Sequence, residues 1–372
     1  MKQFSNELNK IKSSVSDTVW EALCEFDAII GGGAITSVFC NRDINDLDIY
    51  LRSEGDFFGL IEYIYDSSNF SLIAANMTDR SILFRDRETE QDVQLIVYKF
   101  FKDANELFND YDFTVNMGAL NCKTEQFEFH DEFFKHNSQR YLQFHVGTTY
   151  PLISALRVQK YIDKGYSISK AQMLRILLTI SALKLNSWDD IKDHCGGFYG
   201  LNMDEVFPED KEFTLELAIE TLDNVFGDNK FKTYFREISQ NEIIDKFFEN
   251  YHSNDLRVSS MGKYFKNVKD DGNGIYSSTY KKEFKYEVDK VVNGGANGIY
   301  FYEGYEVLTG IYNEYANGNV ILELELSKEQ LESTNKSFNK LCVKGDVKVI
   351  GVYTKLEFFK KFKKEIKQGI IC

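Results

Sequence analysis

The chain has few cysteines, almost no proline and no long apolar run, and these shortages exclude several classes of protein. The six cysteines are scattered and form no Cys-x-x-Cys pair, which argues against a zinc site and favours reduced thiols. No stretch approaches the roughly 18–20 apolar residues that a membrane-spanning helix needs. The first ten residues lack the apolar core of a signal peptide. We therefore expect a cytoplasmic protein with no membrane partner.

What the chain has in quantity is apolar, aromatic and acidic residues. Its 372 residues are 43% hydrophobic and 15% aromatic, enough for two or three packed domains. Abundant Asn, Lys, Ile and Tyr, with two prolines, hint at an AT-rich genome such as that of a phage. The net charge of −14 is uneven, because residues 257–372 carry 19 Lys and Arg against 15 Asp and Glu, leaving −18 in residues 1–256. An acidic front half argues against extensive nonspecific tracking of nucleic acid.

One stretch, residues 26–51, combines a glycine turn with two carboxylates. It reads FDAIIGGGAITSVFCNRDINDLDIYL and predicts a strand, three glycines, a short helix and a second strand. Side chains alternate along a strand, so Asp46 and Asp48 share a face, roughly 6–7 Å apart. Carboxylates so placed suit Mg²⁺, held together with substrate phosphates. Two such ions about 3.5–4 Å apart would bridge the attacking and leaving oxygens of a phosphoryl displacement.

The glycines predict the complementary half of a phosphate site. Gly31, Gly32 and Gly33 follow a strand and precede a helix, where backbone N–H groups can face a phosphate. The hydroxyls of Thr36 and Ser37 would add two donors. We therefore predict that Gly32, Gly33, Thr36 and Ser37 bind the phosphates of a nucleotide.

The combination resembles the head of the DNA polymerase β nucleotidyltransferase superfamily, and more closely that of tRNA CCA-adding enzymes and bacterial poly(A) polymerases. That branch has two glycines, an Arg and an Asp-x-Asp strand in this order, as Gly32-Gly33, Arg42 and Asp46-Leu47-Asp48 follow here. The resemblance implies a third carboxylate on a neighbouring strand. The strand in residues 90–100 places Asp92, Gln94 and Ile96 on one face, and we predict Asp92 as this ligand. The alternative is an exposed Asp at the start of a strand.

A second motif, Asp112-Phe113-Thr114-Val115-Asn116, resembles the family motif RRDFTxNAL. The resemblance implies that Asp112 and Asn116 contact the nucleotide, and a carboxylate and an amide can bind a ribose hydroxyl or a base edge. The alternative is an Asx cap that opens a helix. Asp110 and Tyr111 stand where the family has two arginines, which removes positive charge from the triphosphate site.

The first two helices predicted beyond this motif lie in residues 150–165 and 169–185. Residues 150–165 open with Pro151 at a first helical turn, and resemble the family helix that joins the head to the neck. Arg157 and Lys160 match its later basic pair, so the resemblance implies that they bind the nucleotide. Residues 169–185 form a strongly apolar helix. Its residues Met173, Leu174, Leu177 and Leu178 are predicted to lie in a core.

The fold class that follows is α+β, in three parts. Residues 1–125 would form the catalytic head, a mixed sheet with flanking helices; residues 126–252 a helical neck and body; residues 256–372 a small β-rich domain. The last domain ends in a basic amphipathic helix, residues 355–367, whose apolar side carries Leu356, Phe359 and Phe362. This helix packs on its own domain, on a partner or on RNA.

The sequence therefore predicts a Mg²⁺-dependent nucleotidyltransferase. It would move a nucleoside monophosphate from a nucleoside triphosphate to an acceptor hydroxyl and release pyrophosphate. Asp46, Asp48 and Asp92 would hold two Mg²⁺ ions. The resemblance favours an RNA acceptor, the 3′ end of tRNA. The alternatives are a protein or small-molecule hydroxyl, as in a toxin-like transferase, or a catalytically silent nucleotide- or RNA-binding protein.

Overall fold

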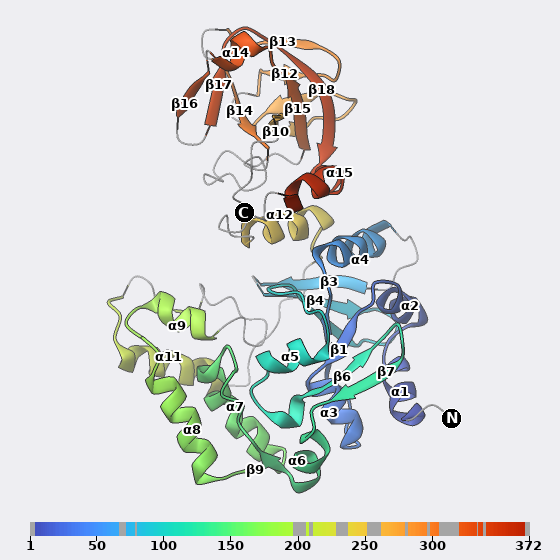
Figure 1. The fold of residues 1–372 in the computed structure, drawn as a ribbon, viewed down its shortest axis with the longest axis vertical. Coiled ribbons are helices and arrows are strands. Elements are labelled where there is room, and N and C mark those ends of the chain that lie inside the picture. Colours follow the sequence, from blue (N-terminus) through green and yellow to red (C-terminus); the bar gives the residue numbers. More distant parts are fainter. Residues whose placement is uncertain are drawn as a thin grey trace. The chain divides into compact units, whose positions relative to one another are not determined.

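The computed structural model describes residues 4–66, 72–78, 80–195, 206–207, 211–227, 237–250, 262–279, 282–295, 298–304, 320–332, 334–337 and 340–368. The chain divides into two compact units, Met1–Gln240 and Asn241–Cys372, and each is described by itself (Figure 1). Both combine helices with a sheet, so the predicted α+β class is confirmed. Among the described residues, no helix has the length and apolar character needed to cross a membrane.

The first unit is built on a seven-stranded sheet in the order β3-β4-β5-β2-β1-β6-β7. In this sheet β2 and β5 run parallel, and the other neighbouring strands run antiparallel. The strands are β1 (Ile29–Gly31), β2 (Asp46–Tyr50), β3 (Leu72–Met77), β4 (Ser81–Asp86), β5 (Asp92–Ile96), β6 (Gly118–Asn121) and β7 (Gln126–Phe129).

The strands β2 and β5 have one buried apolar face and another face that carries polar side chains. Leu47 and Ile49 of β2 are buried, as are Val93 and Leu95 of β5, while Asp46, Asp48, Asp92 and Gln94 lie on the other face. The helix α4 (Glu54–Asp66) buries Phe57, Leu60, Ile61 and Ile64, because these side chains recur at helical spacing. The helices of this part are α1 (Ser5–Lys12), α2 (Asp17–Glu25), α3 (Gly33–Phe39), α4 (Glu54–Asp66) and α5 (Ala104–Asp110).

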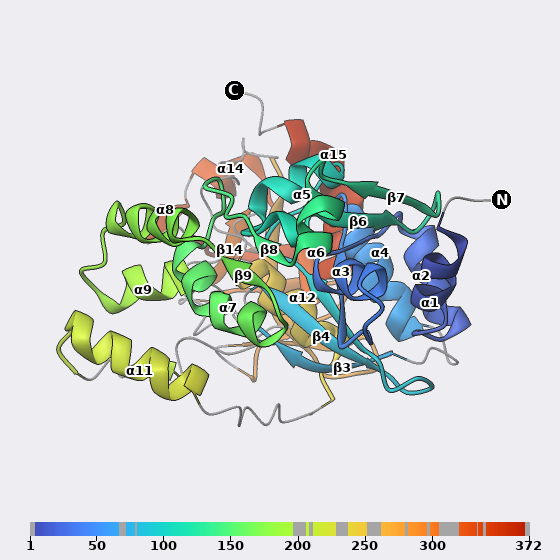
Figure 2. The ribbon, with the colours of Figure 1, turned by 90° about the horizontal axis from the view of Figure 1, so that it is seen from below.

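Helices and one short strand pair complete the first unit (Figure 2). They are α6 (Phe133–Gln139), β8 (Tyr141–Leu142), α7 (Pro151–Asp163), β9 (Ser167–Ile168), α8 (Lys170–Ser181), α9 (Trp188–Cys195) and α11 (Leu215–Gly227). The helix α7 has Pro151 in its first turn, as predicted. The hairpin of β6 and β7 spans the predicted boundary between residues 125 and 126, so Gln126–Phe129 belongs to the sheet.

One prediction about α8 is wrong. Leu174, Leu177 and Leu178 do not lie in a core, because 57%, 53% and 68% of their surfaces are exposed. The buried residues of α8 are Gln172 and Ile176, which lie on its other side. The apolar residues of α8 extend over more than one side of the helix, and the described residues cover one of these sides.

The second unit has nine strands in one sheet. Seven follow in the order β13-β18-β15-β10-β14-β17-β16, while β11 pairs with β10 and β12. The predicted boundary at residues 252–256 lies outside the described residues. The elements are β10 (Tyr264–Asp270), β11 (Tyr276–Ser278), β12 (Lys285–Tyr286), β13 (Val291–Asn293), β14 (Ile299–Glu303), β15 (Val320–Glu325), β16 (Asn335–Ser337), β17 (Lys340–Val343), β18 (Asp346–Thr354), α12 (Gln240–Asn250), α14 (Lys328–Glu332) and α15 (Lys355–Gln368).

The C-terminal amphipathic helix α15 packs on its own unit, one of the three placements left open by the sequence. Phe358 and Phe362 are buried, and their rings lie 4.7 and 5.4 Å from that of Phe265 on β10. Leu356 and Phe359 are buried too. The apolar side of α15 is therefore occupied by the sheet that precedes it.

Candidate functional site

The glycine turn lies between β1 and α3, as the sequence predicted. Gly32 has φ 72° and ψ −128°, a conformation that glycine alone adopts without strain. A Cβ on Gly31 would lie 2.4 Å from the hydroxyl of Tyr111, and one on Gly32 would lie 3.3 Å from it. Gly33 is exposed, and a Cβ there would meet no atom within 4 Å. A ligand can thus approach the backbone at Gly33, while Tyr111 closes the space above Gly31.

Two of the predicted phosphate donors are engaged within the protein. The N–H of Gly32 donates to the carbonyl of Gly118 at 3.1 Å. The hydroxyl of Thr36 lies 2.7 Å from the carbonyl of Val115 and 3.1 Å from that of Gly32. These bonds hold α3 against β6 and the segment before it. Ser37, which follows in α3, is half-buried.

The acid pair lies on the polar face of β2. Asp46 is exposed and Asp48 half-buried, and both point to the side opposite the buried Leu47. Desolvation of its carboxyl, and then the neighbouring charge of Asp46, raise the pKa of Asp48 to about 7. Two adjacent carboxylates that repel each other in this way bind a divalent cation favourably, because the ion removes the repulsion.

Asp92 lies beside this pair but has another partner. The parallel register of β2 and β5 sets Asp92 opposite Asp46. Its carboxylate forms an ion pair with Arg85, the residue opposite it on β4, at 2.5 Å. Among the described residues, no group of three or more His, Cys, Asp or Glu side chains could hold a metal ion. Asp46 and Asp48 therefore fit a Mg²⁺ ion whose remaining ligands are phosphate oxygens. Asp92 could bind the same ion only after its ion pair with Arg85 is broken.

A row of cations on α7 interacts with the acid pair. Arg157 and Lys160 both lower the pKa of Asp48, and Asp46 acts in turn on Lys160 and Lys164. Although Lys160 is exposed, desolvation of its ammonium group, followed by the charge of Arg157, lowers its pKa. Lys164 was not predicted from the sequence. Its spacing of seven residues from Arg157, two helical turns, could have indicated it.

Arg42, the arginine of the first motif, binds the backbone at Lys164, the last residue of the basic row. Its guanidinium donates to the carbonyl of Lys164 at 2.6 Å and lies 5.7 Å from the ring centre of Tyr166. The chain leading into β2 is thereby tied to the end of α7. Arg42 positions the basic row.

The second motif joins the same group of side chains. Asp112 and Asn116 are buried around a 3₁₀ turn, Thr114–Asn116, and Asp112 forms an ion pair with Arg157 at 3.1 Å. The amide nitrogen of Asn116 donates to Asp112 and to the hydroxyl of Tyr161. The amide oxygen of Asn116 is buried with no hydrogen-bond partner in the described part of the chain. The helix-cap alternative is wrong, because no side chain caps this turn.

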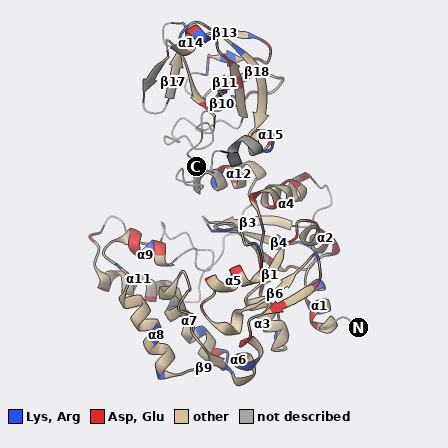
Figure 3. Cartoon of the chain, viewed as in Figure 1, with Lys and Arg blue, Asp and Glu red and all other residues tan. Residues whose placement is uncertain are grey.

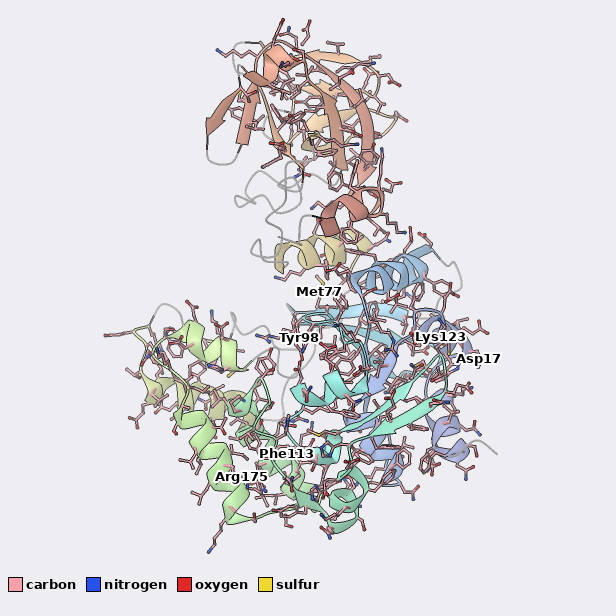
Figure 4. The ribbon with its side chains drawn as sticks, in the orientation of Figure 1. Asp17, Met77, Tyr98, Phe113, Lys123 and Arg175 are labelled. Atoms are coloured by element: carbon pink, nitrogen blue, oxygen red, sulfur yellow. The ribbon has the colours of Figure 1, made fainter. Side chains whose placement is uncertain are left out.

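Positive charge also lies near Asp110, which stands in place of an arginine. Asp110 accepts from Lys99 and from the hydroxyl of Tyr98, both at 3.2 Å. The guanidinium of Arg80 lies 5.8 Å from the ring centre of Tyr98, labelled in Figure 4, and 4.6 Å from that of Tyr150. Desolvation and the charge of Asp110 raise the pKa of Tyr98, with a smaller effect from Asp48. The strand order that brings these residues together was not predicted.

Comparisons with known proteins give one family and one group of solved structures. Residues 2–140 match the model of the Gabija anti-defense 2 family. A protein of Bacillus phage SPbetaL7 named "Gabija anti-defense 2" is 43% identical over 233 residues. That match covers 62% of this chain and 56% of the phage protein, so the chain spans little more than half the length of this relative.

The solved structures similar to this chain include CCA-adding enzymes. The enzyme of Thermotoga maritima, complexed with tRNA, is 11% identical with a TM-score of 0.37, and the match covers 66% of each chain. The enzyme of Bacillus stearothermophilus, in complex with CTP, is 14% identical with a TM-score of 0.35, and the match covers 50% of each chain.

Proposed function

We propose that this protein is a Mg²⁺-dependent nucleotidyltransferase that moves a nucleoside monophosphate from a nucleoside triphosphate to an acceptor hydroxyl. The observation that carries this proposal is the pairing of Asp46 and Asp48 with the basic row of α7, next to the open backbone at Gly33. Carboxylates for a metal and cations for phosphates, meeting at a glycine turn, are the parts that phosphoryl transfer needs.

In this reaction the acceptor oxygen bonds to the α-phosphorus, and the bond to the bridging oxygen breaks, so that pyrophosphate leaves. Asp46 and Asp48 would hold Mg²⁺, which supplies charge neutralisation at the phosphates. Arg157, Lys160 and Lys164 would bind the phosphate oxygens. Asp92 is the candidate to take the proton of the acceptor hydroxyl.

The nucleoside would contact the second motif. The buried amide oxygen of Asn116 has no hydrogen-bond partner among the described residues, and a ribose hydroxyl would supply a donor. Asp112 holds Arg157 toward the acid pair by its ion pair. These two residues would thus orient the sugar and one phosphate-binding cation.

For the acceptor we propose an RNA 3′ end, tRNA in the first instance, because residues 26–51 and 112–116 resemble motifs of tRNA CCA-adding enzymes. The name of the phage relative, "Gabija anti-defense 2", suggests a biological role in countering a bacterial defence. We propose that the transfer inactivates a component on which a bacterial defence depends. A protein or small-molecule hydroxyl is the alternative acceptor that the same site would serve.

The test is incubation of the protein with Mg²⁺, each labelled nucleoside triphosphate in turn, and total RNA or total protein of a host cell. Label in a tRNA-sized band, lost in Asp46→Ala/Asp48→Ala, would support transfer to RNA and identify the base. Label on a protein band would move the acceptor to a side-chain hydroxyl. Absence of label from RNA, protein and small molecules would contradict the proposal.

A catalytically silent nucleotide-binding protein is the second candidate, and two contacts favour it. The carboxylate of Asp92 is paired with Arg85, which keeps it from binding a metal. The hydroxyl of Tyr111 fills the space beside Gly31. A triphosphate that raises the melting temperature, together with no transfer to any acceptor, would support this second reading.

A further inference from the structure

An apolar surface of the first unit is left open on α8. Leu177 and Leu178 lie one helical turn after Leu174, and each of the three side chains is more than half exposed. They lie on the side of α8 opposite the buried Ile176. Exposure of three neighbouring leucine side chains to water is unfavourable in free energy. Exposed apolar patches of this kind often mark sites where a protein binds another molecule.

A second open apolar row lies on α11. Leu215 and Ile219 are one turn apart, and 50% and 58% of their surfaces are exposed. Ala218 and Leu222, which lie beside this row on the same side of the helix, are buried in the cluster that contains Trp188. The helix α11 thus has its own core contacts and still presents a leucine and an isoleucine to solvent.

The charges beside these two rows are of opposite sign. The helix α8 carries two exposed cations, Lys170 and Arg175, and has no acidic residue (Figure 3; Arg175 is labelled in Figure 4). The helix α11 carries three exposed anions, Glu216, Glu220 and Asp223, and has no basic residue. Two copies of α8 would repel each other, whereas α8 and α11 are complementary both in apolar surface and in charge.

The two helices lie on one side of the first unit. Figures 1 and 2 both show α8 and α11 on the side turned away from α1 and α2. A second copy related by a twofold axis could therefore place its α11 on α8 and its α8 on α11 at once. Such an isologous contact uses both rows twice and closes at two copies.

We propose that the leucine row of α8 and the acidic apolar row of α11 form the contact between two copies of this chain, with α8 of one copy lying on α11 of the other. The occupant is a second copy because the chain itself supplies the complementary row. The contact concerns association and is independent of the proposed transfer reaction.

The first test measures the molar mass of the full-length chain over a range of concentrations by analytical ultracentrifugation. The unaltered protein is expected to be a dimer. Leu174→Glu/Leu178→Glu should weaken dimerisation by about 100-fold or more, since it places charge in a desolvated contact. Val291→Glu is the matched control, because Val291 is 59% exposed on β13 of the other unit.

The second test identifies the pairing by exchange of charges. Arg175→Glu and Glu220→Arg should each weaken the dimer about 5–10-fold, and the two together should restore it to within about threefold. Unchanged far-UV circular dichroism in every variant would show that the exposed substitutions leave the fold intact.

Three outcomes would overturn the proposal. One is an unaltered chain that stays monomeric at about 100 µM. Another is a dimer that survives Leu174→Glu/Leu178→Glu. The third is a double charge exchange that fails to recover the loss caused by each single one, since this would exclude α8 against α11.

Discussion

Each of the two units has a carboxylate on a central strand of its sheet, and the two carboxylates differ in their partners. Glu323 of β15 is buried, accepts from the hydroxyl of Tyr353 at 2.6 Å, and lies near the ammonium groups of Lys263 and Lys361 at 3.6 and 3.7 Å. Asp48 of β2 lies beside another carboxylate, and burial and this neighbour raise its pKa to about 7. The charge of Glu323 is satisfied within the fold, which indicates a structural role, while that of Asp48 favours a bound cation.

The comparison predicts the largest effect at the acid pair. Asp46→Asn/Asp48→Asn should reduce nucleotide transfer by about 10³-fold or more, because it removes the charges that hold the metal. The free energy of unfolding without metal should stay unchanged or rise, since the repulsion between the two carboxylates is lost. Transfer rates and thermal unfolding in EDTA would measure both. A large loss of stability would contradict the difference drawn between the two units.

The opposite pattern is expected at Glu323. Glu323→Ala should lower the free energy of unfolding of the second unit by about 1–3 kcal/mol, because Tyr353 loses its acceptor and the two lysines lose the negative charge beside them. Urea unfolding of the full chain would measure it. Glu325→Ala is the matched control, since Glu325 is exposed on the same strand. Transfer activity should be the same in both variants, and its loss in Glu323→Ala alone would assign this carboxylate a functional role.

A smaller effect is expected at the end of the basic row. Lys164→Gln should raise the KM for the triphosphate about 5–10-fold with little change in kcat, because it removes one phosphate-binding charge. Lys123→Gln, at an exposed lysine between β6 and β7, controls for the loss of one positive charge. Equal KM values in the two variants would remove Lys164 from the site.

The smallest effect is expected at Arg85. Arg85→Gln frees Asp92 from a partly exposed ion pair, which should cost about 0.2–1 kcal/mol of stability. If Asp92 then helps to bind the metal, half-maximal activity should need about two- to fivefold less Mg²⁺. A Mg²⁺ titration of activity would decide this. An unchanged requirement would leave Asp92 outside the metal site.

The local parts of the site could be predicted from the sequence because short-range rules fix them. Alternation along a strand places Asp46 and Asp48 on one face, and glycines between a strand and a helix predict the turn at Gly32. The family resemblance indicates Arg157 and Lys160, and their spacing of three residues places them on one side of α7. These inferences depend on residues close together in the chain.

The non-local parts could not be predicted in this way. The ion pair of Asp92 with Arg85 depends on which strands are neighbours, and the position of Tyr111 over Gly31 depends on how the segment after α5 returns to β1. The error at Leu174, Leu177 and Leu178 has the same origin, because an apolar pattern indicates that a surface is covered without indicating what covers it.

The central claim is that the polar face of the first sheet transfers a nucleoside monophosphate. The most direct measurement compares triphosphates labelled at the α-phosphorus with those labelled at the γ-phosphorus, with host RNA and protein as acceptors. The account predicts that α-label enters an acceptor, that γ-label is released as pyrophosphate, and that both are lost in Asp46→Ala/Asp48→Ala. Entry of γ-label into the acceptor, or transfer that persists in the double variant, would contradict it.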